Sequence, residues 1–363
     1  MSTQVNRRNF VKTIIGSAVA LSIAPQAFAQ YGPIPGKILL RYNENPYGPS
    51  PEGLKAGAEA AAVGAYYPET IESDLRTAIA TRNSVAIENM VLSSGSNEAL
   101  HAAMVAYGKQ GKVLMPSLTY DGHVAYAKRM GVEFLQVPLD KDMSIDLDAM
   151  AAAVDDSISL VYICNPNNPT GKALDGDRLR AFCRAVGKKA VVLVDEAYNE
   201  VTDDPEYTSM LDLVREGENV FVTRTFSKIF GMAGYRIGYG IGHPDIAKLV
   251  GGHIMGSLNT VGMATALASY QDEEFIAFSR GKIIEGRKMV NATFRRNGIE
   301  PLPSQTNFVY ADIGRNATEL ADKLAARNIL IRGSYKGAAN YSRVSMGKLA
   351  DLEEFDRVFT EIY

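Results

Sequence analysis

The sequence has few cysteine and histidine residues. Its 363 residues include two cysteines and four histidines. Cys164 ends an apolar run and Cys183 lies in a helical pattern, so we interpret both as buried small side chains rather than as a disulfide. The histidines are scattered along the chain without the spacing of metal ligands, and we therefore predict no metal site.

The chain also lacks an excess of basic charge. Its formal net charge is −3 and its isoelectric point is about 5.9, which argues against a nucleic-acid partner. No Gly-x-Gly-x-x-Gly motif lies between an early strand and a helix, which disfavours a dinucleotide-binding enzyme. What is present is an ordinary globular composition, 46% hydrophobic and 22% charged, in a chain long enough for two domains.

The N-terminal region contains no apolar run suited to a membrane span. The run at 13–24 is uncharged, but it is short and rich in Gly, Ser and Thr. Arg7 and Arg8 precede it, and Ala27-Phe28-Ala29 follows as a small-x-small cleavage signal. This order is typical of a signal peptide and resembles the twin-arginine export signal, with a basic amphipathic terminus as the alternative. We therefore exclude 1–29 from the fold and expect a periplasmic or otherwise extracytoplasmic protein without stable membrane insertion.

Strands and helices alternate through the middle of the chain. Apolar runs such as 160–164 and 190–194 do not alternate with polar residues, which is typical of strands buried on both faces. Helical patterns, one of them at 120–130, separate the strands, so we predict an α/β fold with a mainly parallel sheet and helices on both faces. The predicted parts are an N-terminal arm with part of a small domain at 30–64, a large domain at 65–265 and a smaller α+β domain at 266–363.

Polar residues follow the ends of three predicted strands. Asn165–Gly171 follows one strand, Asp195–Tyr198 follows the next, and Lys228 comes soon after a third. Because ligands bind beyond the carboxyl ends of strands in α/β sheets, we expect these residues to share one site. Upstream, Gly95-Ser96-Asn97 opens an alanine-rich helix, and backbone N–H groups at such a helix start can bind a phosphate.

Lys228 lies among hydroxyl side chains, with an arginine eight residues further along the chain. Its amine can condense with an aldehyde, while Thr225, Ser227 and Arg236 can donate hydrogen bonds to a phosphate. Taken alone, a solvated loop lysine is the more common case. The other motifs favour a Schiff-base lysine beside a phosphate site.

These motifs together resemble the fold-type I pyridoxal-phosphate enzymes, specifically the class I/II aminotransferases and, within them, the histidinol-phosphate aminotransferase group. The resemblance extends over nearly all of the chain after residue 40. It implies PLP-transferase fold type I, with a seven-stranded sheet in the large domain, and pyridoxal 5′-phosphate as the cofactor. The motifs that carry it are Asn43–Gly48, Tyr67–Glu69, Asn168–Gly171, Asp195–Tyr198, Ser227-Lys228 and Arg343–Gly347.

The resemblance implies catalytic roles for Lys228, Asp195 and Tyr198. Lys228 would hold the cofactor covalently and, once released, carry the proton between the substrate α-carbon and the cofactor. Asp195 would keep the pyridine nitrogen protonated. Asn168 and Tyr198 would hydrogen-bond the ring hydroxyl oxygen. Tyr120 would stack on the ring, with a core aromatic as the alternative.

The resemblance also implies how the cofactor phosphate is bound. A tyrosine at the position of Tyr67 reaches the phosphate of the neighbouring subunit in the family, which implies a homodimer with shared active sites. Asn97 stands where many relatives carry aspartate, a tolerable change for a phosphate contact. The phosphate-binding residues within one chain would be Gly95, Ser96, Asn97, Thr225, Ser227 and Arg236.

Substrate contacts follow from the same resemblance. Arg343 would bind the α-carboxylate through two parallel hydrogen bonds, and Arg332 matches an arginine thought to bind a substrate phosphate. Asn45 and Tyr47, from the motif near the N-terminus, are further substrate-binding candidates. The predicted reaction moves an amino group to a 2-oxo acid from an amino acid, either histidinol-phosphate-like or aromatic or another free amino acid. Decarboxylation, elimination or oxidation on the same scaffold is the alternative.

Overall fold

The computed structural model describes residues 32–335 and 337–363. The predicted signal peptide at 1–29 lies outside the described residues and stays a prediction. Within the described part of the chain, no helix is both long and apolar enough to cross a membrane. The same residues include no group of three His, Cys, Asp or Glu side chains that could hold a metal ion.

A seven-stranded sheet forms the centre of the larger part of the molecule. Its strand order is β2-β8-β7-β6-β5-β3-β4, and only the pairs that involve β8 are antiparallel. All five residues of β6 are buried, as expected for an apolar run without alternation. The strands are β2 (Met90–Ser93), β3 (Lys112–Pro116), β4 (Phe134–Val137), β5 (Ile158–Cys164), β6 (Val191–Asp195), β7 (Val220–Thr225) and β8 (Gly238–Gly242).

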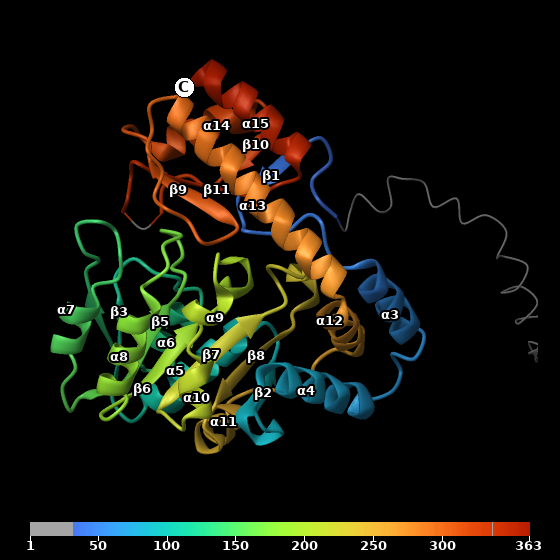
Figure 1. Cartoon of the computed structure of the whole chain (residues 1–363), viewed down its shortest axis with the longest axis vertical. Helices are drawn as coiled ribbons and strands as arrows, with labels where there is room; N and C mark the ends of the chain where they lie inside the picture. The colour runs from blue at the N-terminus through green and yellow to red at the C-terminus, as the bar shows by residue number, and fades with distance from the viewer. Residues whose placement is uncertain (1–31, 336) are drawn as a thin grey trace, which may run out of the picture.

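Helices cover both faces of this sheet (Figure 1). α5 (Ser96–Gly108), α6 (Val124–Arg129) and α11 (Pro244–Gly251) enclose one hydrophobic cluster with the sheet. α8 (Gly176–Val186) and α10 (Leu211–Arg215) contribute to a second cluster, which continues into the smaller part of the molecule. The remaining helices of this region are α3 (Pro51–Ala61), α4 (Glu69–Asn83), α7 (Leu147–Ala152), α9 (Pro205–Thr208) and α12 (Thr260–Gln271), with 3₁₀ turns at Ile87–Asn89, Asn199–Val201 and Ala233–Tyr235.

The smaller part of the molecule joins the N-terminal arm to the C-terminal residues. β1 (Ile38–Leu40) pairs in parallel with β10 (Ile329–Ile331), so the blue arm lies among orange and red elements in Figure 1. β9 (Phe308–Asp312) pairs antiparallel with β11 (Tyr341–Ser345). The helices of this part are α13 (Glu273–Arg296), α14 (Ala317–Ala326) and α15 (Leu349–Ile362). The arm thus reaches the C-terminal lobe as the sequence suggested, while the domain bounds stay a prediction.

One local expectation differs from the structure, one strand was not predicted, and one further expectation agrees. The helix expected at 120–130 begins only at Val124, because the preceding residues form a loop that lines the cavity described below. β2 had no sequence prediction, since four consecutive buried residues are too few for a periodic pattern. The start of α3 agrees: the Gly53 N–H donates to Ser50 Oγ at 3.0 Å, with Pro51 in the first turn.

Candidate active site

A cavity of about 370 Å³ lies beyond the carboxyl ends of β5, β6 and β7, where the sheet meets the smaller part of the molecule. Most site residues predicted from the sequence line it. They come from loops after parallel strands, from the start of α5 and from β11. The lining residues are Tyr42, Asn43, Ser96, Asn97, Tyr120, Asp121, Gly122, Asn168, Asp195, Ala197, Tyr198, Thr225, Ser227, Lys228, Ala233, Arg236, Arg332, Tyr335 and Arg343.

Lys228 follows β7 and extends its amine into this cavity. Its Nζ donates a hydrogen bond to the Asn43 carbonyl at 3.0 Å and lies 5.6 Å from the centre of the Tyr198 ring. Burial, assisted by the positive charge of Arg343, lowers the pKa of Lys228 from 10.5 to about 8. The neutral amine is the form that attacks an aldehyde, so this environment favours covalent binding of a carbonyl compound.

Asp195 ends β6 with its carboxylate facing the cavity, and the residue is only 2% exposed. The hydroxyl groups of Tyr162 and Thr223 donate to its two oxygens at 3.4 and 3.3 Å. Burial raises the pKa of Asp195 to about 6. A buried carboxylate is stabilised by a cationic partner, and a protonated ring nitrogen of a cofactor would be such a partner.

A chain of hydrogen bonds connects Tyr198, Asn168 and Arg343. The Asn168 amide donates to the Tyr198 hydroxyl at 3.3 Å, and Arg343 Nη1 donates to Asn168 Oδ1 at 2.6 Å. Arg343 is 5% exposed, and burial lowers the pKa of its guanidinium. The residues predicted for the ring oxygen and for the substrate anion are therefore joined in one hydrogen-bonded group.

Asn43 is a site residue that the sequence analysis did not include. Its side chain donates to the Tyr198 hydroxyl at 3.0 Å and accepts from Ser345 Oγ at 2.8 Å, while its carbonyl accepts from Lys228. Its φ of 56° lies in the left-handed region, which asparagine tolerates better than most residues. Asn43 is the first residue of the motif Asn43–Gly48, and its place in that motif, at a turn of the N-terminal arm, was the feature of the sequence that could have identified it.

The residues predicted for the cofactor phosphate converge at the N-terminus of α5. Gly95 precedes the helix with φ of 71°, and a Cβ atom there would collide with the guanidinium of Arg236. Arg236 Nη1 donates to Ser227 Oγ at 3.4 Å, and Thr225 Oγ1 donates to the same oxygen at 2.9 Å. A helix start, two hydroxyl groups and a guanidinium form a donor set that suits a dianion.

Tyr120 lies at the edge of this phosphate region. Its hydroxyl donates to Asn97 Oδ1 at 3.1 Å, and both residues line the cavity together with Ser96. Burial raises the pKa of Tyr120 to about 12, so the hydroxyl stays protonated at neutral pH. Asn97 therefore accepts a hydrogen bond that orients the Tyr120 side chain.

Arg332 lines the cavity beside Arg343, with which its backbone pairs. Its guanidinium lies 5.5 Å from the centre of the Tyr335 ring, and the Tyr335 hydroxyl donates to Asp121 at 3.5 Å. Tyr42, which is half exposed, lines the same cavity. Sequence analysis missed Tyr42, Asp121 and Tyr335, because they come from three separate loops and no motif marks them.

Four of the predicted residues do not line the cavity: Gly95, which precedes α5, and Asn45, Tyr47 and Tyr67. Asn45 donates from its amide to the Ile229 carbonyl and to Ser279 Oγ, at 2.8 and 2.7 Å. The Tyr47 hydroxyl accepts from the Leu349 N–H at 3.0 Å. Both contacts anchor the arm rather than a ligand. Tyr67 is 89% exposed on the surface of its own chain.

The geometry fits pyridoxal phosphate. Lys228 offers an amine for the aldehyde, Asp195 a carboxylate for the ring nitrogen, and Arg236 with the α5 N-terminus offers donors for the phosphate. The absence of a side chain at Gly95 lets the Arg236 guanidinium pack directly against the start of α5. This fold and donor set define a pyridoxal-phosphate-dependent enzyme of fold type I.

Comparison with known proteins identifies the family. The family model for class I and II aminotransferases matches residues 35–359. The chain is 34% identical over 329 residues to a histidinol-phosphate aminotransferase of Brevibacillus brevis, covering 90% of each, and 36% identical over 314 residues to one of Symbiobacterium thermophilum, covering 85% of this chain and 86% of the relative. The chain therefore belongs to the class I and II aminotransferases.

A solved relative agrees on fold and cofactor. The histidinol-phosphate aminotransferase of Sinorhizobium meliloti, in complex with pyridoxal-5′-phosphate, matches with a TM-score of 0.80 and 26% identity, covering 96% of this chain and 97% of that one. The predicted fold class, cofactor and enzyme class are confirmed: the protein is a pyridoxal-phosphate-dependent aminotransferase. The alternative of a decarboxylase, lyase or oxidase is not favoured.

Proposed function

We propose that the amino donor carries an anionic group and an imidazole or other aromatic side chain, and that a 2-oxo acid accepts the amino group. The observation that supports this most directly is that Arg343 and Arg332 line the cavity into which Lys228 extends. Two guanidinium groups suit a phosphate or a carboxylate. Tyr42 and Tyr335 offer aromatic surface for the side chain. Histidinol phosphate, for which the relatives are named, and histidine both meet this description.

We assign the following roles to the residues of the chain. The bound cofactor supplies a ring that accepts electrons from the substrate α-carbon. Lys228 moves the proton at the α-carbon through its Nζ, and its low pKa keeps a usable fraction of the amine neutral. Asp195 holds a proton on the ring nitrogen, since its buried negative charge needs a cationic partner. Arg343 binds the anionic group of the substrate and at the same time orients Asn168.

A homodimer with shared sites is the expected assembly. Val63, Tyr66, Tyr67 and Met255 expose large apolar or aromatic side chains, with 89% exposure at Tyr67. Exposed side chains of this kind are commonly covered by a partner, and we infer that a second copy covers Tyr66 and Tyr67, with Tyr67 near the partner's cofactor phosphate. Sedimentation velocity should give a dimer, and Tyr67→Ala should weaken cofactor binding. A monomer that retains full cofactor affinity would contradict this inference.

Export by the twin-arginine route is a further part of the proposal. It rests on Arg7, Arg8 and the Ala27-Phe28-Ala29 signal. Export in the folded state would let the enzyme take up its cofactor before it leaves the cytoplasm. Cell fractionation of the full chain should find it outside the cytoplasm, and a double Arg7→Lys, Arg8→Lys variant should remain inside. Wild-type protein retained in the cytoplasm would overturn this part.

The donor class can be tested by half-transamination without an acceptor. Purified protein with bound cofactor is titrated with histidinol phosphate, histidine, tyrosine, phenylalanine and aspartate, and loss of the visible absorption band is followed with the oxo product. We expect the imidazole and aromatic donors to react and aspartate to react least. Arg332→Met should impair phosphate-bearing donors more than carboxylate-bearing ones. Preferential reaction with aspartate would refute the proposed donor class.

A further inference from the structure

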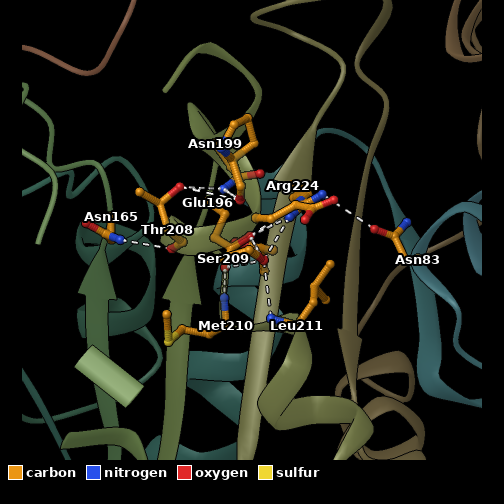
Figure 2. Close-up of polar contacts among 12 residues, drawn as sticks. Asn83, Asn165, Glu196, Asn199, Thr208, Ser209, Met210, Leu211 and Arg224 are labelled. Carbon is orange, nitrogen blue, oxygen red and sulfur yellow. Dashed lines mark hydrogen bonds and ion pairs between the residues drawn. The ribbon is translucent and has the colours of Figure 1, made fainter. Parts of the chain in front are cut away.

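Glu196 and Arg224 form a buried ion pair directly behind the active site. The Glu196 side chain is fully buried, and that of Arg224 is 11% exposed. Nε and Nη2 of Arg224 donate to one oxygen of the carboxylate at 3.0 and 2.8 Å. Figure 2 shows this pair at the ends of two adjacent strands, with Ser209 and Met210 beside the carboxylate.

The surroundings of the pair complete its hydrogen bonding. Ser209 Oγ lies 3.1 and 2.9 Å from the two Glu196 oxygens, and the Met210 N–H donates to the carboxylate at 2.6 Å. Arg224 Nη2 also contacts Ser209 Oγ at 2.9 Å, and Nη1 contacts Asn83 Oδ1 at 3.4 Å. Removing one partner would leave a charge uncompensated in the interior, which is far more costly than losing a surface ion pair.

The position of the pair in the sheet links two cavity residues. Asp195, the last residue of β6, precedes Glu196, and Thr225, the last residue of β7, follows Arg224, so each member of the ion pair is the chain neighbour of a cavity residue. The parallel ladder between β6 and β7 ends at the pair Asp195–Thr223. Thr225 lies two residues beyond that last ladder pair. The Glu196 N–H donates to the Thr223 carbonyl at 2.9 Å as the last backbone link, and the side-chain contact of Arg224 with Glu196 adds the next link between the two strand ends.

We propose that Glu196 and Arg224 are positioning residues that fix the separation between Asp195 and Thr225. The inference rests on the proposed function, in which Asp195 holds the ring nitrogen of the cofactor and Thr225 belongs to its phosphate site. A cofactor bound at both ends requires these two strand ends to stay in register. The contact with Ser209 and Met210 also holds the end of the loop that begins with Tyr198.

The test compares ligands that use both ends of the site with ligands that use one. Glu196→Gln keeps the shape and most hydrogen bonds of the side chain but removes its charge. We expect its dissociation constant for pyridoxal phosphate, measured by the visible band and by circular dichroism of the bound cofactor, to rise about tenfold or more. The affinity of the variant for inorganic phosphate and for pyridoxal, each of which uses one end of the site, should fall by no more than about threefold.

The matched control is Asp212→Asn, which breaks a nearby ion pair between Asp212 on α10 and Arg180 on α8. That pair does not join the ends of β6 and β7. The control should lose thermal stability yet bind pyridoxal phosphate with wild-type affinity. If Glu196→Gln does not fold, the double variant Glu196→Gln, Arg224→Gln, which removes both charges of the pair, provides the same comparison of ligands.

Two results would overturn the positioning role. One is unchanged affinity for pyridoxal phosphate in the folded variant, and the other is an equal loss for pyridoxal phosphate and for inorganic phosphate. Either result leaves the site assignment intact if the wild type binds the cofactor and Lys228→Ala does not form the visible band. A Lys228→Ala variant that retains that band and full turnover would instead refute the proposed function itself.

Discussion

The pH dependence of cofactor uptake follows from the environment of Lys228. Burial and the charge of Arg343 lower the pKa of Lys228 from 10.5 to about 8. Only the neutral amine attacks an aldehyde, so the rate of uptake should follow the neutral fraction. With a pKa of about 8 that fraction rises from about 9% at pH 7 to about 90% at pH 9, whereas an ordinary lysine would reach only about 3% at pH 9.

The variant Arg343→Met isolates one cause of this shift, because it removes the charge and keeps an apolar side chain of some length. One pKa unit corresponds to about 1.4 kcal/mol. The repulsion between two like charges about 12 Å apart reaches this energy at an effective dielectric constant of about 20. The pKa of Lys228 should therefore rise by roughly one unit in Arg343→Met. Uptake at pH 7 should then slow by about tenfold.

The assay mixes apoprotein with pyridoxal phosphate between pH 6 and 10 and follows the visible band by stopped flow. Arg332→Met is the matched control, since Arg332 lines the same cavity but is not among the main causes of the pKa shift at Lys228. The control should keep the wild-type midpoint near pH 8. A wild-type midpoint near 10, or the same midpoint in both variants, would refute the reasoning.

Three further predictions concern single residues. Gly95→Ala should weaken pyridoxal-phosphate binding about tenfold or more in an equilibrium titration, because residue 95 has φ of 71° and its Cβ would meet Arg236. Between its ordinary pKa of 3.8 and its folded value of about 6, Asp195 keeps a proton that the unfolded chain has lost, so the apoprotein loses stability as the pH rises through this window. The free energy of unfolding of apo Asp195→Asn, measured in urea, should thus be higher than that of the wild type by up to about 3 kcal/mol above pH 6, and the difference should disappear near pH 4. Equal stability of the two proteins at both pH values would count against this prediction. Ser50→Ala should cost about 1 kcal/mol by removing the α3 cap, without a change in cofactor affinity.

The sequence predicted the sheet and the catalytic motifs because both depend on local patterns. Strands buried on both faces read as continuous apolar runs, and polar residues at their carboxyl ends meet at one edge of the sheet whatever the connecting helices do. Lys228 and Asp195 could be placed in this way. Tyr335 and Asp121 could not, because their contact joins loops that are far apart in sequence and no periodicity connects them.

The adjacent acids Asp195 and Glu196 show where such reasoning ends. Side chains alternate along a strand, so one acid must face the cavity and the other the opposite side, but the pattern does not say which. Packing decides: Tyr162 and Thr223 donate to Asp195, while Arg224 and Ser209 surround Glu196. Without Arg224 on the reverse face, the second acid would be a buried charge with no cation beside it, which a protein interior tolerates poorly. Two neighbouring carboxylates at the end of β6 thus reach different surroundings because each side supplies a different partner.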